Sequence, residues 1–465
     1  MRSWVLGLWA CAWAVVSSAQ GLPASVQRAL EQARLPAQAL HVVVAPAQGG
    51  APVVRWGAEQ AVNPASLMKL ITTSAALEML GPTYVWRTVV WTDGVVSEGV
   101  LRGNLYVQGR GDPKWVAERL WLLLRRVQAM GITRIQGDVV LDQSAFDTPE
   151  VDPGAFDGQP QRPYNASPQA LLINYKSVVL HWSVDAAQRV ARVHAEPPMA
   201  GMRWPREVPL SPGPCMDYRG ALKADFSDPL QWVFRGAYPA DCGERVWPVA
   251  DLEPATHAQR AVEGTWRAIG GQLDGQVRTG RVSANARLLL SAESPTLAEV
   301  IRDINKYSNN VMAEQLFLTL SLEASGLGQA QASRALLQRW WDQHVGQPGL
   351  VIDNGSGLSR TGRVTASGLA ALLQRMWRGP HMPELVASLP ISAQDGTLRR
   401  TQSKAQAHLK TGSLNQVLGV AGYVDADQGQ RWVVVALLEH PQAQQGRAVL
   451  DALIDAVAQL PPHQP

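Results

Sequence analysis

A serine and a lysine with the spacing needed for nucleophilic catalysis stand early in the chain, in the segment Ser66-Leu67-Met68-Lys69. On a helix, residues three apart share a face, so the Lys69 amine can reach the Ser66 hydroxyl. A serine hydroxyl is a weak nucleophile near neutral pH and needs a base. Lysine is such a base only when burial or a neighbouring cation lowers its pKa. Taken alone, this spacing is also typical of an ordinary exposed pair on a helix.

Two later segments carry further groups suited to acyl transfer. Tyr307-Ser308-Asn309-Asn310 falls at a break between two helical patterns, where side chains can project into a cleft. Lys410-Thr411-Gly412-Ser413 lies near the end of a predicted strand, and the missing side chain of Gly412 would let a substrate backbone lie against that strand. Each segment alone is equally typical of a polar loop or turn.

The ordered combination of S-x-x-K, S-x-N and K-T-G is far more specific than any of its parts, because it is the motif set of penicillin-interacting serine enzymes. The sequence resembles the D-alanyl-D-alanine carboxypeptidase/endopeptidase family, the class C low-molecular-mass penicillin-binding proteins of the penicillin-binding protein 4 type (peptidase S13). Four further segments support the resemblance: Gly109-Arg110-Gly111-Asp112-Pro113, Ala313-Glu314-Gln315, Asp353-Asn354-Gly355-Ser356-Gly357-Leu358-Ser359-Arg360 and Asp395-Gly396-Thr397-Leu398.

The resemblance implies a role for each catalytic group. Ser66 would be the acylated nucleophile and Lys69 its general base, and Ser308 would pass a proton to the departing D-alanine amine. The backbone N–H groups of Ser66 and Ser413 would form the oxyanion hole. No metal or organic cofactor is implied.

The resemblance also implies how the substrate is held. Asn310 would bind a peptide group of the substrate, while Lys410, supported by the Thr411 and Ser413 hydroxyls, would attract its terminal carboxylate. Repulsion from Lys410 would in addition keep Lys69 neutral. The expected partners are peptidoglycan stem peptides, with β-lactam antibiotics as covalent inhibitors.

The implied activity is a serine D,D-peptidase that cleaves D-Ala-D-Ala bonds (carboxypeptidase) and D-alanyl-diaminopimelyl cross-links (endopeptidase) through an acyl-enzyme on Ser66. Two alternatives remain open at this point. One is a β-lactamase-like or esterase serine hydrolase, and the other is a non-catalytic protein that binds the cell wall. Penicillin turnover at many per second would favour the first, and failure to release D-alanine from a pentapeptide would favour the second.

Hydrophobic periodicity predicts the elements that position these residues. A helix is expected directly after Ser66, running to Leu80 with Gly81 as its stop signal. A β-hairpin is expected over 40–56, helices over 296–322, 329–343, 366–377 and 446–460, and strands over 407–410, 417–424 and 431–438. The fold class is therefore α+β: a penicillin-recognising, serine transpeptidase-like domain with an antiparallel sheet sandwiched by helices.

The stretch between the first two motifs has a different pattern, with short strand-like runs and one helical stretch near 114–130. We therefore expect a catalytic domain split between 20–84 and 286–465. We expect a β-rich insertion over 85–285 that forms two subdomains.

The first residues indicate export. Arg2 precedes an apolar run from Trp4 to Val16, and the small residues Ser17-Ser18-Ala19 predict signal-peptide cleavage after Ala19. Family resemblance then places the mature protein in the periplasm.

Removal of the leader leaves Cys215 and Cys242, both inside the insertion. In an oxidising compartment a disulfide is expected, the alternative being two buried free thiols.

Composition narrows the possible partners. The net charge is only +3, from 42 basic and 39 acidic residues, and no run of like charges suggests a nucleic-acid-binding tail. Nucleic acid is therefore not expected as a partner, and contact with a membrane is expected to be peripheral at most.

Overall fold

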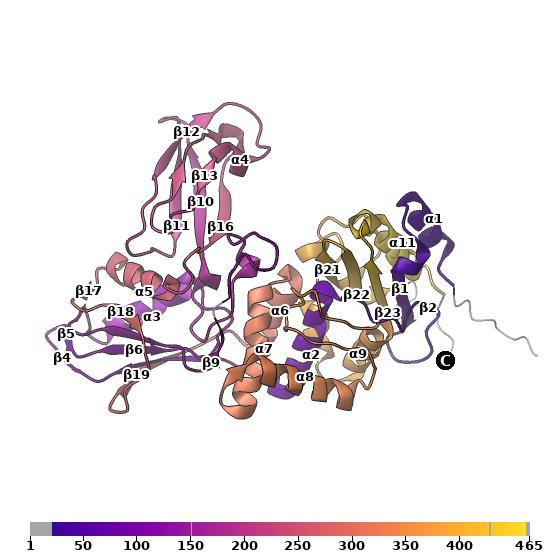
Figure 1. Ribbon diagram of the computed structural model, residues 1–465, viewed down its shortest axis with the longest axis horizontal. Helices are drawn as coiled ribbons and strands as arrows, with labels where there is room; N and C mark the ends of the chain where they lie inside the picture. Colours follow the sequence, from indigo (N-terminus) through magenta and orange to yellow (C-terminus); the bar gives the residue numbers. More distant parts are fainter. Residues whose placement is uncertain (1–20, 150, 427–428, 462–465) are drawn as a thin grey trace, which may run out of the picture.

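The computed structural model describes residues 21–149, 151–426 and 429–461. Figure 1 shows a layered part that contains the chain ends next to a second part built from the middle of the sequence. The predicted leader and its cleavage site after Ala19 lie outside the described residues. Within the ranges that the structure describes, no helix is long and apolar enough to cross a membrane.

A five-stranded antiparallel sheet joins the two ends of the chain, in the order β2-β1-β23-β22-β21. The early strand β1 pairs along its whole length with the late strand β23. The strands are β1 (Leu40–Pro46), β2 (Val54–Trp56), β21 (Ala407–Leu414), β22 (Val417–Asp425) and β23 (Arg431–Glu439).

Helices cover both faces of this sheet (Figure 1). Alternate strand residues face opposite ways, so Val43 and Val435 join the core beneath α2 and α6–α10, whereas Val44 and Val434 join the core beneath α1 and α11. The helices are α1 (Ala24–Gln32), α2 (Met68–Leu80), α6 (Leu297–Tyr307), α7 (Asn310–Ser325), α8 (Ala330–His344), α9 (Ala366–Arg378), α10 (Met382–Ser388) and α11 (Arg447–Ala458). The predicted sandwiched antiparallel sheet is confirmed, and α1 and α10 are additions to it.

The chain leaves this layered part after α2 and returns to it with α6. The segment between them forms two small sheets with α3 and α5, and a further sheet that rises from them (Figure 1). The first two sheets have the orders β18-β8-β6-β3-β19 and β17-β7-β5-β4, and the third is β15-β12-β11-β10-β16.

Most elements of this segment are short. They are β3 (Arg87–Thr92), β4 (Val95–Ser97), β5 (Val100–Arg102), β6 (Leu105–Gln108), α3 (Ala117–Ala129), β7 (Arg134–Ile135), β8 (Val139–Asp142), β9 (Phe146–Asp147), β10 (Ser177–Asp185), β11 (Val190–Glu196), β12 (Glu207–Ser211), α4 (Tyr218–Leu222), β13 (Ala224–Asp225), β14 (Val233–Phe234), β15 (Tyr238–Pro239), β16 (Arg245–Ala250), α5 (His257–Ala268), β17 (Gln272–Leu273), β18 (Val277–Thr279) and β19 (Arg287–Glu293). The small strand β20 (Gly328–Gln329) pairs with β9.

Two features of the insertion differ from the sequence expectation. α5 is a second long helix, whereas the sequence predicted only one helical stretch in this region. β19 pairs with β3, so the inserted sheet continues past the expected boundary at 285. The division into domains and subdomains otherwise stays a prediction.

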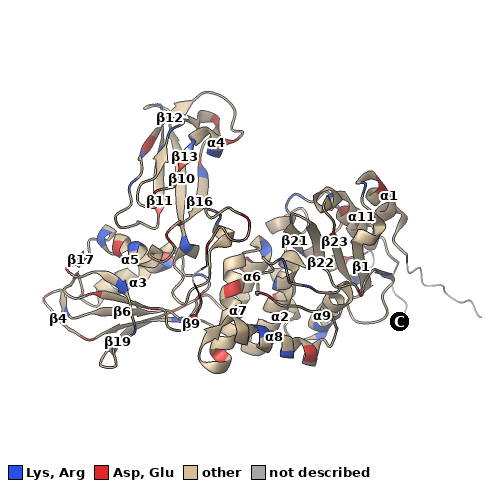
Figure 2. Ribbon diagram, viewed as in Figure 1, with Lys and Arg blue, Asp and Glu red and all other residues tan. Residues whose placement is uncertain are grey.

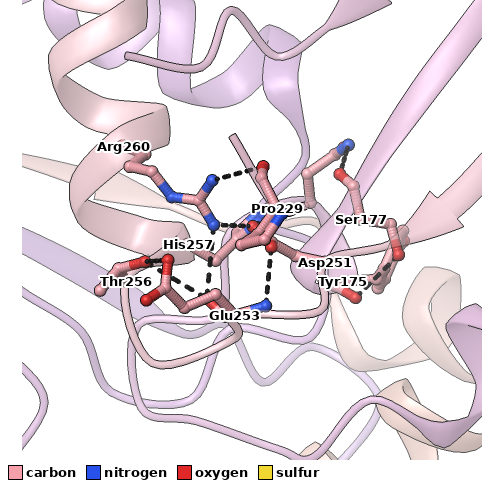
Figure 3. Close-up of polar contacts among 9 residues, drawn as sticks. Tyr175, Ser177, Pro229, Asp251, Glu253, Thr256, His257 and Arg260 are labelled. Carbon is pink, nitrogen blue, oxygen red and sulfur yellow. Dashed lines mark hydrogen bonds and ion pairs between the residues drawn. The ribbon is translucent and has the colours of Figure 1, made fainter. Parts of the chain in front are cut away.

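A buried charge cluster fastens α5 to the end of β16 (Figure 3). The Asp251 carboxylate accepts from Arg260 at 2.5 Å and lies 2.9 Å from Nδ1 of His257. Arg260 also donates to the Pro229 carbonyl. His257, Asp251 and Arg260 are all buried, so this cluster packs α5 against the end of β16.

Cys215 and Cys242 form a disulfide, which confirms that prediction and removes the free-thiol alternative. Among the described residues, basic and acidic positions occur in both the layered part and the insertion (Figure 2).

Candidate active site

The chain makes a sharp turn immediately before Ser66. Ala65 has a φ of 46°, a conformation that costs a non-glycine residue free energy, and it is held there by its neighbours. Its N–H donates to Asn63 Oδ1 at 2.8 Å, and Asn63 in turn donates to the Ser359 carbonyl. Ser66 follows in the one-turn 3-10 helix Ala65–Leu67, which leads into α2. The turn therefore places Ser66 at a helix start, as predicted.

Lys69 has a complete set of hydrogen-bond partners. Its Nζ lies 3.0 Å from Ser66 Oγ, 2.7 Å from Asn310 Oδ1 and 2.7 Å from the Ser356 carbonyl oxygen. The last two atoms only accept, so a neutral amine would give them its two hydrogens and keep its lone pair for the Ser66 hydroxyl. This arrangement suits removal of a proton from Ser66.

Burial sets the charge of this amine. Lys69 is fully buried, which lowers the pKa of its amine to about 7, while the negative charge of Glu314 opposes the shift. Burial, followed by repulsion from Lys69, also holds the pKa of Lys410 well below its usual range. Burial is thus the largest cause of the lowered pKa at both lysines, and the two amines repel each other.

Ser308 and Lys410 form a second pair beside the first. Ser308 ends α6 in a left-handed conformation, and its Oγ accepts from Lys410 Nζ at 2.9 Å. Lys410 also donates to the Thr411 carbonyl at 2.7 Å. The helix break that the sequence predicts thus turns Ser308 toward the K-T-G strand.

Asn310 is the link between these groups and the insertion. Its Oδ1 accepts from Lys69, and its Nδ2 donates to the Tyr164 carbonyl at 3.2 Å. The side chain predicted to bind substrate is thus already bonded within the protein, and it orients Lys69.

Strand β21 lies at the edge of the sheet, next to the Ser66 turn. A Cβ on Gly412 would come within 2.8 Å of the Pro64 carbonyl oxygen, so glycine is needed for the close approach of the strand to the turn. Thr411 Oγ1 donates to Thr397 at 2.7 Å, and the exposed Ser413 lies beside Gln444. An edge strand with these hydroxyls can accept an extended substrate.

Glu314 and Ser356 are site residues to which the sequence analysis gave no role. Glu314 Oε1 accepts from Ser356 Oγ at 2.7 Å, and the carbonyl of the same serine accepts from Lys69. Burial raises the pKa of Glu314 to about 7, and the Ser356 hydrogen bond and Lys69 oppose that shift. Both residues stand in segments that carry the family resemblance, but only the three-dimensional structure shows that Ser356 contacts Lys69 and that Glu314 interacts with it electrostatically.

Among the described residues, no group of three or more His, Cys, Asp or Glu is arranged to hold a metal ion. The side chains that meet here are instead a serine beside a buried lysine, a second serine-lysine pair and an asparagine. This combination on a helix-covered antiparallel sheet defines the class of penicillin-interacting serine hydrolases.

Comparison with known proteins narrows this class to one family. The chain belongs to the D-Ala-D-Ala carboxypeptidase 3 (S13) family, which it matches over residues 22–460. It is 30% identical over 453 residues to the D-alanyl-D-alanine carboxypeptidase of Actinomadura sp. (strain R39), covering 91% of this chain and 81% of that protein. It is 23% identical to the D-alanyl-D-alanine carboxypeptidase DacB of Haemophilus influenzae, covering 80% of each chain.

The fold agrees with this assignment. The crystal structure of penicillin binding protein 4 (dacB) from Haemophilus influenzae superimposes with a TM-score of 0.74 at 20% identity, covering 94% of this chain and 99% of that one. That protein has also been solved in complex with a novel β-lactam. The protein is thus a serine-type D-Ala-D-Ala carboxypeptidase, a peptidase that acts on peptidoglycan.

Proposed function

We propose that the enzyme cleaves the terminal D-Ala-D-Ala bond of peptidoglycan stem peptides, and D-alanyl-diaminopimelyl cross-links, through an ester on Ser66. The contact that supports this most directly is the one between Lys69 and Ser66. With both hydrogens of a neutral Lys69 amine taken by Asn310 and Ser356, its lone pair is left for the Ser66 proton.

In the first half-reaction, Ser66 Oγ loses its proton to Lys69 and attacks the carbonyl carbon of the scissile bond. The resulting oxyanion is stabilised by the N–H groups of Ser66 and Ser413; the loss of one such donor typically costs about 10²–10³-fold in rate. The C–N bond then breaks, and the leaving amine takes a proton through Ser308. Water afterwards attacks the ester, giving the shortened peptide and the free Ser66 hydroxyl.

Substrate binding uses the cationic end of the site. Lys410 would attract the terminal carboxylate, with Thr411 and Ser413 as hydrogen-bond donors. The substrate backbone would extend β21 as an additional strand. β-Lactams would acylate the same Ser66 and be released slowly. The structure of the Haemophilus protein complexed with a novel β-lactam supports binding of this class of molecule.

We place this reaction in the periplasm, on the basis of the predicted leader and the cell-wall substrate.

The test is release of D-alanine from a purified muropeptide pentapeptide. Ser66→Ala should reduce release to background, whereas Ser413→Ala, which keeps its backbone N–H, should retain the acyl-transfer step and raise KM. A cross-linked muropeptide dimer, tested in parallel, measures the endopeptidase activity. Release by Ser66→Ala at the parent rate would refute the proposed nucleophile.

A further inference from the structure

A cleft of about 710 Å³ lies in the insertion, away from the reactive serine. One wall is the loop 158–164, and the other is formed by α4 with the residues after it and by the end of β16. Phe226 and Trp247 provide aromatic surface, with ring centroids 5.3 Å apart. The cleft is thus built between two segments distant in sequence.

All the charged residues that line the cleft are cationic: Arg162, Arg219 and Lys223. Within the described ranges, none of them forms an ion pair. Arg162 donates to the neutral Gln159, and Arg219 lies 5.3 Å over the Trp247 ring. Of the nearby acids, Asp225 pairs with Arg235 and Asp217 caps α4. Asp157 accepts from Tyr164 and Asn165 and offsets part of the charge of Arg162. The positive charge of the cleft therefore rests mainly on Arg219 and Lys223.

The loop that forms one wall also contacts the active site. The Tyr164 carbonyl accepts from Asn310, whose other amide atom accepts from Lys69. The Gln161 carbonyl accepts from the Ala250 N–H at the end of β16. A chain segment bound in the cleft would therefore rest on the same loop that abuts the catalytic amide.

We propose that this cleft binds a second, carboxylate-bearing part of the peptidoglycan polymer whose stem peptide is being cleaved. The inference rests on the proposed function, because it is that function which brings this polymer to the enzyme. Stem peptides carry free carboxylates that suit Arg219 and Lys223, and the flat faces of the glycan sugars suit Trp247 and Phe226. The cleft would thus favour polymeric substrate over short peptides.

Binding can be measured without chemistry by using Ser66→Ala as the parent and cosedimenting it with purified sacculi. In that background, Arg219→Glu with Lys223→Glu should weaken binding about tenfold, since two attractive charge contacts become repulsive. A matched control is Arg203→Glu with Arg206→Glu, which makes the same charge change at two exposed residues that do not line the cleft. Thermal melting of each variant verifies that it is folded.

Sacculi whose carboxylates have been amidated test the ligand chemistry. Amidation should weaken binding of the parent about tenfold more than it weakens binding of the cleft variant, which keeps only the carboxylate contact at Lys410. The inference is overturned if the cleft variant binds like the control variant, if amidation leaves parent binding unchanged, or if the parent does not bind sacculi. Failure of the proposed function would instead appear as absent D-alanine release by the enzyme with Ser66 intact.

Discussion

At the scale of single residues, the site contains two buried titratable groups that interact, Lys69 and Glu314. Lys69 and Glu314 both have a pKa of about 7, and Ser356 bridges them through its carbonyl and its hydroxyl. Glu314 interacts electrostatically with Lys69 and Asp353, and Lys69 also interacts electrostatically with Lys410. Because these groups interact, the pH dependence of acylation belongs to the cluster as a whole.

Glu314→Gln gives a pH prediction with a definite sign. Glu314 raises the pKa of Lys69, so removing its charge lowers that pKa and leaves more neutral amine in acid. In a plot of the penicillin acylation rate against pH, the fall in rate on the acid side (the acid limb) should move about one pH unit lower. Glutamine keeps an oxygen that can accept from Ser356, so the fold should persist.

The control for this prediction lies on the same helix. Glu323 contacts the Tyr84 hydroxyl and Arg110 at the other end of α7, so Glu323→Gln should leave the limb in place. The electrostatic coupling of Glu314 to Lys69 would be contradicted if the acid limb did not move in Glu314→Gln. It would also be contradicted if the acid limb moved equally in both variants.

The sequence predicted the contact between Lys69 and Ser66, because residues three apart share a face of a helix. Short motifs singled out Ser66, Lys69, Ser308, Asn310 and Lys410, which the structure brings together. The sequence left open whether burial or a neighbouring cation lowers the pKa of Lys69, because burial is a property of the folded chain. The contact of Glu314 with Ser356 joins two segments 42 residues apart, which no local pattern specifies.

At the scale of elements, the Ser66 turn is held in its conformation by a loop from another part of the chain. Gly357 has a φ of +77°, and a Cβ there would lie 1.9 Å from the Ala65 carbonyl oxygen. Ala65, itself at positive φ, cannot yield without moving Ser66. The close packing of Gly357 against Ala65 thus holds Ser66, the proposed nucleophile, in position.

Gly357→Ala should therefore reduce penicillin acylation by at least about 10²-fold, because even a 1 Å misplacement of a reacting group is that costly. Gly326→Ala is a matched control: its φ of +81° imposes a similar backbone strain, but its Cβ would enter open space. It should lower stability by about 1 kcal/mol and leave the acylation rate near that of the parent. Equal loss of acylation in both variants would show that backbone strain alone, and not the contact with Ala65, is responsible.

At the scale of the whole molecule, most buried apolar residues of the insertion form a core of their own, whereas Phe146 and Ala170 pack into the core of the layered part. The sequence indicates an inserted region because apolar periodicity changes from helical to strand-like after α2 and back again at α6. It did not reveal α5, nor that β19 belongs to the inserted sheet, because pairing between distant short strands depends on contacts that a local pattern does not encode.

The disulfide should stabilise the insertion alone. It joins residues 27 apart, and removing that loop constraint from the unfolded chain costs about 3–4 kcal/mol. The double variant Cys215→Ser with Cys242→Ser should unfold at a lower urea concentration, measured as the midpoint of the change in tryptophan fluorescence. Its penicillin acylation rate should equal that of the parent. Reductant should produce the same shift in the parent and none in the variant. An unchanged midpoint would contradict the stabilising role, and a lost acylation rate would contradict the independence of the two cores.

The central claim is that Ser66, activated by a neutral Lys69, forms a covalent acyl-enzyme. The most direct measurement is intact-protein mass spectrometry after incubation with benzylpenicillin, followed by peptide mapping. We predict one adduct with the full mass of the drug, located on the peptide that contains Ser66 and absent from Ser66→Ala. An adduct on another residue, or one that persists in Ser66→Ala, would contradict the account.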